Sequence, residues 1–389
     1  MISGGSEKIG DLVEILSGAP FESERFGDEG DLPLIRIRDV VPGKSSTYYT
    51  GDYDPKYLVA DGDVLVGMDG DFNRARWHGG KALLNQRVCK IVVSSPLLDE
   101  KYLYHFLPAA LKAIWDNTPF VTVKHLSVKD IRSIEIPLPS INVQRRIADI
   151  LDRADALRAK RRAALARLDE LTQAIFIEMF GDGGEDNTRW PIRNISDFVA
   201  GFEGGKSLEA DSEEDSRCVH RILKISAVTG MFYRPEESKP LPVSYIPPKA
   251  HHAKQGDLLF SRANTSELVG AVAYVWETPA NLVLPDKLWR FVWKDQNVAD
   301  PLFVWALFQT DAVRHEIVRR ATGTSGSMKN IGQKKVMGIR TILPPYQLQK
   351  RFSDQVRHIR QLQNVGRNAM ENHDSLFASL QDRAFRGAL

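Results

Sequence analysis

The stretch AGFEGGKS, at residues 200–207, is the part of the sequence that comes closest to a nucleotide-binding motif. A phosphate-binding loop has the pattern G-x-x-x-x-G-K-[ST], in which backbone N–H groups and the lysine bind the phosphates. Gly205, Lys206 and Ser207 fit this pattern, but Ala200 stands where the first glycine is needed. The residues that follow, LEADSEEDS, predict an acidic loop, whereas phosphate binding needs a helix N-terminus there. We therefore predict a turn and no ATPase activity.

Other stretches that resemble catalytic motifs are also incomplete. DNTPF, at residues 116–120, is close to the N-P-P-[FY] loop that grips a flipped adenine, but Thr118 replaces the first proline and no glycine-rich cofactor loop follows a strand. Cys89 and Cys218 are too few and too far apart for a disulfide scaffold or a thiolate metal site. The nine histidines form no catalytic triad pattern. We expect no catalytic residue, bound cofactor or metal in this chain.

Size and composition are those of a globular protein with several domains. The 389 residues are enough for about two to four domains. No apolar run approaches the roughly 20 residues that cross a bilayer, and the first residues lack the apolar core of a signal peptide. Since 52 basic and 50 acidic residues nearly cancel, any nucleic-acid surface must be a local patch. We expect a cytoplasmic protein.

The sequence contains the same unit twice. IPLPSINVQRRIADILD, at residues 136–152, returns as ILPPYQLQKRFSDQVRH at residues 342–358, with Gln144 aligned to Gln349. Three earlier pairs occur in the same order in both halves: IGDLVEI and ISDFVAG, GDVLV and GDLLF, and LNQRVCKIVV and LPDKLWRFVW. Chance matches would not keep this order. We infer an internal duplication.

Each copy is predicted to be an α/β domain followed by a long helix, which makes the fold class α+β. Short β-type runs precede a helical stretch and a proline-marked junction, and apolar residues then recur every three or four positions from Val143 and from Leu348. Forty helical residues would extend about 60 Å. Two such stripes most simply pack on each other as an antiparallel coiled coil, with looser packing where Gly366 and His373 interrupt the second stripe. The predicted boundaries are 1–140, 141–180, 181–345 with a linker at 181–191, and 346–389.

This order of segments resembles the specificity (S) subunit of type I restriction-modification enzymes. The most specific part is the junction I-P-L-P-x-x-x-x-Q before a long basic and acidic helix, and the likeness spans essentially the whole chain. The second junction departs from it, since it reads LPPYQLQKRF. The resemblance implies that the α/β domains are target recognition domains related by a pseudo-twofold repeat. It also implies that the long helices set the spacer between them and dock methyltransferase subunits.

The resemblance further implies a division of labour among subunits. Each recognition domain would read one half of a bipartite target in double-stranded DNA. Two methyltransferase (M) subunits would carry S-adenosylmethionine, and restriction (R) subunits would use ATP and Mg, so that methylation and cleavage reside in the partners. Two alternatives stay open: the specificity component of a two-subunit type II restriction-methylation enzyme, and a coiled-coil adaptor that binds only protein.

Polar loops at matching positions of the two copies are the candidates for DNA contact. The loops GMDGDFNRARWHGGK and SRANTSE each follow a β-type run. Arg and Asn make bidentate hydrogen bonds with guanine and adenine edges in the major groove. Just before each junction, TPFVTVKHLSVKD and ATGTSGSMKNIGQKK add basic side chains that suit a phosphate backbone. The predicted DNA-binding residues are Asn73, Arg74, Arg76, Lys81, Lys124, Arg262, Asn264, Thr265, Lys329 and Asn330. The alternative is that these are ordinary solvated loops.

Overall fold

The chain folds into two compact units, each described here by itself. The computed structural model describes residues 5–119, 123–184, 188–206, 219–295, 297–323 and 328–386. Unit 1 is Met1–Arg162 with Asn368–Leu389, and unit 2 is Ala163–Arg367. The division passes through both long helices, whereas the sequence suggested divisions at the helix ends. Each helix half joins the hydrophobic core of one α/β domain, so a unit is an α/β domain with half of each helix.

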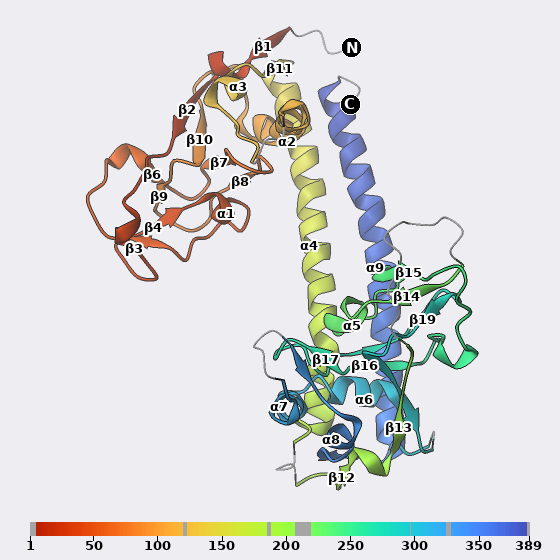
Figure 1. Cartoon of the computed structure of the whole chain (residues 1–389). Helices are drawn as coiled ribbons and strands as arrows, with labels where there is room; N and C mark the ends of the chain where they lie inside the picture. The colour runs from red at the N-terminus through yellow and green to blue at the C-terminus, as the bar shows by residue number, and fades with distance from the viewer. Residues whose placement is uncertain are drawn as a thin grey trace. The chain divides into compact units, whose positions relative to one another are not determined.

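The two units contain similar sets of helices, and two long helices contribute to both. The helices of unit 1 are α1 (Ile37–Val40), α2 (Glu100–Asn117), α3 (Val128–Arg132), the first part of α4 (Ile141–Phe180) and the last part of α9 (Tyr346–Phe385). Those of unit 2 are α5 (Ser226–Thr229), α6 (Pro301–Leu307), α7 (Asp311–Arg320), α8 (Gln333–Met337), the last part of α4 and the first part of α9. Within each unit, the α4 and α9 segments run side by side in opposite directions (Figure 1).

Unit 1 is built around a four-stranded antiparallel sheet in the order β2-β10-β7-β8. A five-stranded sheet, β3-β5-β4-β9-β6, and the pair β1-β11 complete it. Its strands are β1 (Ser6–Lys8), β2 (Val13–Ser17), β3 (Phe26–Gly27), β4 (Leu32–Ile35), β5 (Tyr48–Tyr49), β6 (Leu58–Val59), β7 (Val64–Gly67), β8 (Arg74–Arg76), β9 (Ala82–Leu84), β10 (Val88–Val93) and β11 (Glu135–Pro137). Alternate side chains of β7 and β10 pack with α2 and α4 in one core.

Unit 2 has the same plan. Its four-stranded sheet, β13-β20-β16-β18, matches that of unit 1 strand for strand, and β12-β22 matches β1-β11. A small sheet, β15-β14-β19, and the pair β17-β21 complete it. The strands are β12 (Ile192–Asn194), β13 (Val199–Gly204), β14 (Arg221–Leu223), β15 (Ser238–Pro240), β16 (Leu258–Ser261), β17 (Ala263–Asn264), β18 (Val272–Tyr274), β19 (Leu282–Val283), β20 (Leu288–Trp293), β21 (Lys329–Asn330) and β22 (Arg340–Ile342). The predicted duplication and α+β fold are confirmed.

A buried glutamine explains the junction motif. In unit 1, Gln144 accepts a hydrogen bond from the N–H of Asp99 at 2.9 Å and donates to the carbonyls of Leu97 and Pro139, each at 2.8 Å. Asp99 is the N-cap of α2, and its carboxylate accepts from the N–H groups of the first turn. Gln144 therefore fixes the start of α4 against the start of α2.

The second junction repeats this network despite its different sequence. Gln349 accepts from the N–H of Asp300, the N-cap of α6, at 2.9 Å. It donates to the carbonyl of Pro344 at 2.7 Å and to that of Val298 at 3.2 Å. Both glutamines are fully buried, so an amide that satisfies three backbone groups is the reason for glutamine at this position.

The long helices bury only one side of their predicted apolar stripes. Ile147 and Ile359 are buried, but Leu157 and Leu376 are 59% and 57% exposed. The stripes therefore leave part of their apolar surface exposed to solvent. A stripe with three- and four-residue spacing is wider than one helix contact, and its second side stays open to solvent.

Packing at Gly366 is close, although the sequence suggested loose packing there. A Cβ atom at this position would lie 2.6 Å from Cδ2 of Leu165. The glycine therefore lets Leu165 of α4 approach the backbone of α9 within unit 2. A glycine that interrupts an apolar stripe can therefore be a point of close helix contact, because its missing side chain leaves space for an apolar side chain of the other helix.

Candidate nucleic-acid interface

The two segments predicted to contact DNA in the first copy are hydrogen-bonded to each other in unit 1. Loop 1, residues 68–73, connects β7 to β8, and it pairs with residues 123–127 ahead of the first junction. The N–H of Leu126 donates to the carbonyl of Met68 at 2.7 Å, and the N–H of Gly70 donates to that of Lys124 at 3.0 Å. Sequence alone placed these segments in different parts of the copy, and the fold joins them.

Unit 2 repeats this arrangement. Loop 2, residues 262–265, contains β17, which pairs with β21 so that Asn264 lies opposite Lys329 and Ala263 opposite Asn330. The N–H of Ile331 donates to the carbonyl of Arg262 at 3.0 Å, the counterpart of the bond between Leu126 and Met68. The predicted residues of unit 2 that are brought together are Arg262, Asn264, Thr265, Lys329 and Asn330.

Two predicted arginines of unit 1 are bound by neighbouring side chains. The guanidinium of Arg74 lies 3.4 Å from the ring centroid of Tyr104 in α2. Burial lowers the pKa of Arg74, although the guanidinium stays charged. Arg76 forms an ion pair with Glu100 and donates to the carbonyl of Gly62 at 3.2 Å. These contacts connect β8 to α2, so both arginines have structural partners.

The other predicted residues of unit 1 differ in exposure. Lys124 is buried, with its Nζ 3.6 Å from the ring centroid of Trp115 and donating to the carbonyl of the same residue. Asn73 and Lys81 are exposed. Lys124 therefore fixes loop 1 against α2, and Asn73 and Lys81 are free to reach a ligand.

The unit 2 side chains are partly constrained. The amide of Asn264 donates to the hydroxyl of Thr229 at 3.3 Å and accepts from the N–H of Thr265 at 2.9 Å. Arg262 is half-buried and lies 5.4 Å from the ring centroid of Trp289. Lys329 is half-buried and Thr265 is exposed. A ligand would contact Thr265 and the exposed parts of the half-buried side chains.

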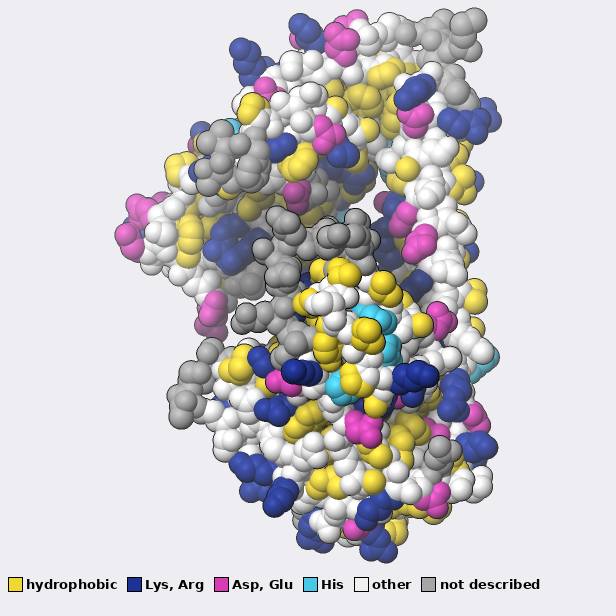
Figure 2. Space-filling view, turned by 45° about the vertical axis from the view of Figure 1, so that its right-hand side comes forward, with side chains coloured by type: hydrophobic (Ala, Val, Ile, Leu, Met, Phe, Trp, Pro, Cys, Tyr) yellow, Lys and Arg dark blue, Asp and Glu magenta, His cyan; other side chains and the backbone are white. Residues whose placement is uncertain are grey.

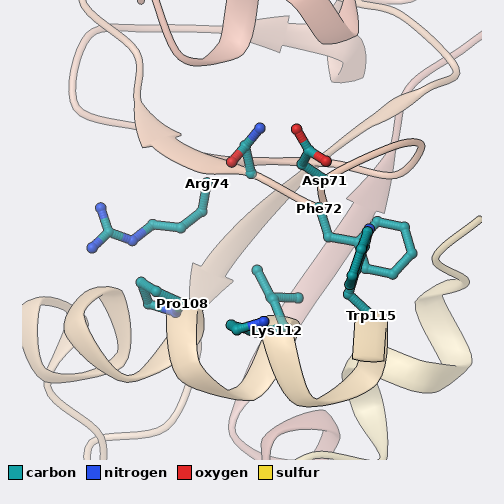
Figure 3. A pocket seen from close by; sticks show the side chains of 8 residues that line it. Asp71, Phe72, Arg74, Pro108, Lys112 and Trp115 are labelled. Atoms are coloured by element: carbon teal, nitrogen blue, oxygen red, sulfur yellow. The ribbon is translucent and has the colours of Figure 1, made fainter. Parts of the chain in front are cut away.

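The sequence reading missed the tip of loop 1 and the α2 residues below it. Asp71, Phe72 and Arg74 of the loop face Lys112 and Trp115 of α2 across a pocket of about 400 Å³ (Figure 3). The glycine at position 70, with a φ of 73°, signals a sharp turn. That glycine was the available sequence signal, because a turn at the end of a buried strand often presents functional side chains.

The glycine of the incomplete phosphate-binding motif has a packing role. Residues Val199–Gly204 form β13, and a Cβ atom at Gly205 would lie 1.7 Å from the carbonyl oxygen of Leu284. The equivalent close approach in unit 1 occurs at Gly18, where a Cβ atom would lie 2.2 Å from the carbonyl oxygen of Asn85. Ser207 lies outside the described residues. The glycine of the motif therefore permits two strands to pack, which needs no nucleotide.

Charge is distributed in small groups. On the face seen in Figure 2, basic side chains alternate with acidic and hydrophobic ones. In the part of the chain that the structure describes, no three His, Cys, Asp or Glu residues are grouped so that they could hold a metal ion. Over the same residues, no helix has the length and apolar character needed to cross a membrane.

Comparison with known proteins finds similar sequences with a stated role. Residues 5–167 match the domain described as Type I restriction modification DNA specificity domain. The chain is 44% identical over 165 residues to the Type I restriction enzyme EcoBI specificity subunit of Escherichia coli. This alignment covers 42% of this chain and 34% of that protein. It is 23% identical to the Type I restriction enzyme EcoKI specificity subunit of Escherichia coli (strain K12), over 98% of this chain and 88% of that protein. Residues 5–167 therefore resemble a type I DNA specificity domain, and the chain is similar to type I specificity subunits over nearly its whole length.

Solved structures agree with this family at the level of the fold. The S subunit of a type I restriction-modification system from M. genitalium has a TM-score of 0.56 and 14% identity, over 99% of this chain and 96% of that one. A chain from a solved type I restriction-modification system has a TM-score of 0.59 and 15% identity, over 100% of this chain and 99% of that one. The curated proteins that the chain resembles are specificity subunits of type I restriction enzymes, and the chain spans about a third of the length of the first and most of the length of the second.

Proposed function

We propose that each unit reads one half of a bipartite DNA target through its loop and pre-junction segment. The observation that carries this is the repeated backbone pairing, Leu126 with Met68 in unit 1 and Ile331 with Arg262 in unit 2. The pairing gathers polar and basic side chains at one place in each unit, as reading a half-site requires. Asn73 in unit 1, and Thr265 and Lys329 in unit 2, are the side chains best placed to contact DNA; Lys81 is exposed but lies beyond the end of the β7–β8 hairpin away from loop 1.

The helices supply the proposed docking surface for two M subunits. In unit 1, Leu157, Leu376 and Leu380 line an apolar groove of about 130 Å³ between α4 and α9. In unit 2, Leu171 and Leu362 occupy the repeat-related positions and are 39% and 45% exposed. Exposed leucines in a row are typical of a protein interface. One M subunit on each groove would complete the methyltransferase, with R subunits added for cleavage.

The cofactors belong to these partners in our proposal. S-adenosylmethionine would be held by the M subunits, and ATP and Mg by the R subunits. The residues of this chain would position DNA and partners, and α4 and α9 would set the length of the unread spacer. Each of these helices is continuous over 40 residues, which corresponds to about 60 Å.

A domain exchange tests the proposal. Residues 1–140 of this chain are replaced by the recognition domain of another specificity subunit, and the chimera is expressed with the cognate M subunits. Methylome sequencing is expected to show a new first half-site, an unchanged second half-site and the same spacer. A change in both half-sites would contradict independent reading, and a wild-type complex that binds no duplex DNA would leave the protein-only adaptor.

A further inference from the structure

The tip of loop 1 carries two polar side chains that the fold does not use. Asp71 and Asn73 are exposed, and no hydrogen bond or ion pair of their side chains exists among the residues that the structure describes. The neighbouring Arg74 and Arg76 are held by Tyr104 and Glu100. The groups of this segment without a partner among the described residues are therefore a carboxylate and an amide, whereas the two guanidinium groups are bound within the unit.

The tip is held in a conformation that ordinary side chains rarely adopt. Phe72 has a φ of 51° and is 2% exposed, and its ring lies beside the indole of Trp115 (Figure 3). Gly70 accepts from Nε1 of Trp115 at 2.7 Å and donates to the carbonyl of Lys124 at 3.0 Å. A left-handed conformation is strained for a residue with a bulky side chain, and such residues tend to occur at functional sites. Here it turns Asp71 and Asn73 outward on a fixed support.

The pocket beside the tip has the size and charge to take part of a DNA strand. Its volume is about 400 Å³, and its walls include the guanidinium of Arg74 and the ammonium of Lys112, which is paired with Asp116 at 2.9 Å. Positive charge there offsets the repulsion between the carboxylate of Asp71 and DNA phosphates. Pro108, Leu111 and Trp115 form the apolar floor. The pocket is therefore polar at its rim and apolar at its base.

Base-edge chemistry decides what a carboxylate in this position can read. In the major groove, adenine presents N6–H₂ and cytosine presents N4–H₂ as donors, whereas guanine and thymine present only acceptors. A carboxylate accepts from the amino groups of adenine and cytosine and is repelled by the oxygens of guanine and thymine. An amide in the same place would tolerate either kind of edge, because it both donates and accepts.

We propose that Asp71 is a specificity-determining residue of unit 1 and accepts a hydrogen bond from the exocyclic amino group of an adenine or cytosine in the first half-site. This rests on the proposed function, because unit 1 must read a half-site for its tip to meet a base. The tip of loop 2 has Asn264 held by Thr229 and offers no free carboxylate at its centre. The second half-site therefore serves as an internal control.

The test uses the full chain with its cognate M subunits. Methylome sequencing defines the wild-type motif, and binding is then measured on duplexes that carry each of the four bases at every position of the first half-site. The variants are Asp71→Asn and Asp71→Ala. Asp52→Asn, an exposed carboxylate in the five-stranded sheet region of the same unit, is the matched control. Thermal melting checks that each variant is folded.

We expect one position of the first half-site at which the wild type prefers adenine or cytosine by on the order of 10-fold or more. Asp71→Asn should remove most of this preference at that position, leave the second half-site unchanged and match Asp52→Asn in melting temperature. Unchanged base preference in both Asp71 variants would overturn the inference, and so would a uniform change in affinity at all bases. A wild-type complex without a bipartite target would instead refute the proposed function.

Discussion

Units 1 and 2 use the same buried contacts to attach their long helices, and differ where the helices meet solvent. Gln144 and Gln349 each satisfy three backbone groups at the start of a helix. They do so although the two junctions differ in sequence: the first contains IPLPSINVQ and the second contains LPPYQLQ. Asp99 and Asp300 have the same N-cap role. A buried polar network tolerates little change because each lost partner leaves an unsatisfied group.

The helix-to-helix ion pairs show the opposite behaviour. Asp374 accepts from Arg158 at 2.6 Å and from Arg162 at 3.3 Å in unit 1. At the repeat-related place in unit 2, Asp169 accepts from Gln363 at 2.8 Å and from Arg367 at 3.4 Å. Both units have the carboxylate, but Gln363 of unit 2 stands where unit 1 has Arg158. These half-exposed contacts contribute less free energy, so the copies were free to diverge there.

The largest expected effect tests the shared network. Gln144→Leu and Gln349→Leu should each lower the free energy of unfolding by about 3 kcal/mol, because buried backbone groups lose their partners. Denaturant unfolding of the full chain measures this. Gln361→Leu, at an exposed position of α9, is the control and should change it by less than about 0.5 kcal/mol. A large effect at only one of the two junctions would break the equivalence of the units.

The next effect concerns a feature of unit 2. Gly366→Leu should destabilise by about 2 kcal/mol, because its side chain overlaps Leu165. Gly366→Ala should be nearly neutral, since a gain of about 1 kcal/mol in helix propensity opposes a contact with the mobile end of Leu165. Asn364→Leu, at an exposed position nearby, is the control in the same unfolding experiment. Equal stability of the Gly366→Leu and Asn364→Leu variants would show that the close approach is unimportant.

A third prediction concerns a titrating group that unit 2 lacks. His105 is 1% exposed and its Nε2 lies 2.7 Å from Asp152; burial lowers the pKa of His105 more than the carboxylate raises it. Burial alone would raise the pKa of Asp152, but its bonds with Lys101 and His105 hold that pKa below its ordinary value. Sequence alignment of the two copies places Ala306 at the matching position of unit 2.

The sign follows from linkage. With a depressed folded pKa, His105 binds its proton more readily in the unfolded chain, so stability is complete above the unfolded value of about 6.5 and falls as the pH drops below it. His105→Gln should flatten this part of the pH profile. The measurement is the urea midpoint of both proteins between about pH 5 and 8. Parallel profiles would contradict the assignment.

The smallest expected effect compares the two aspartates. Asp374→Asn should cost about 0.5–1 kcal/mol at low salt and Asp169→Asn a few tenths less, because Asp374 pairs with two guanidinium groups and both carboxylates are about half exposed. Unfolding at low salt and in about 1 M salt separates charge from packing, since salt screens exposed pairs. A difference that persists in high salt would mean that Arg158 acts through packing on Phe377.

The sequence by itself determined the duplication, the long helices that start near Ile141 and Tyr346, and the resemblance to type I specificity subunits. Repeats and helical periodicity are local patterns, so they can be read without knowing what packs where. The junction glutamines were also recognisable, although their hydrogen-bond partners were not. The incomplete phosphate-binding motif could be dismissed because its alanine and its following acidic residues are local facts too.

Tertiary structure decided which of the predicted side chains are available. Arg74 and Arg76 read as base-contacting residues by type, yet Tyr104 and Glu100 of α2 bind them. Asp71 was not among the residues predicted to bind DNA, and it is exposed at the tip of loop 1. The tertiary structure also decided which side of each apolar stripe is exposed to solvent, as Leu157 and Leu376 show. Exposure and pairing depend on segments far apart in the chain, and a one-dimensional pattern has no information on what covers a side chain.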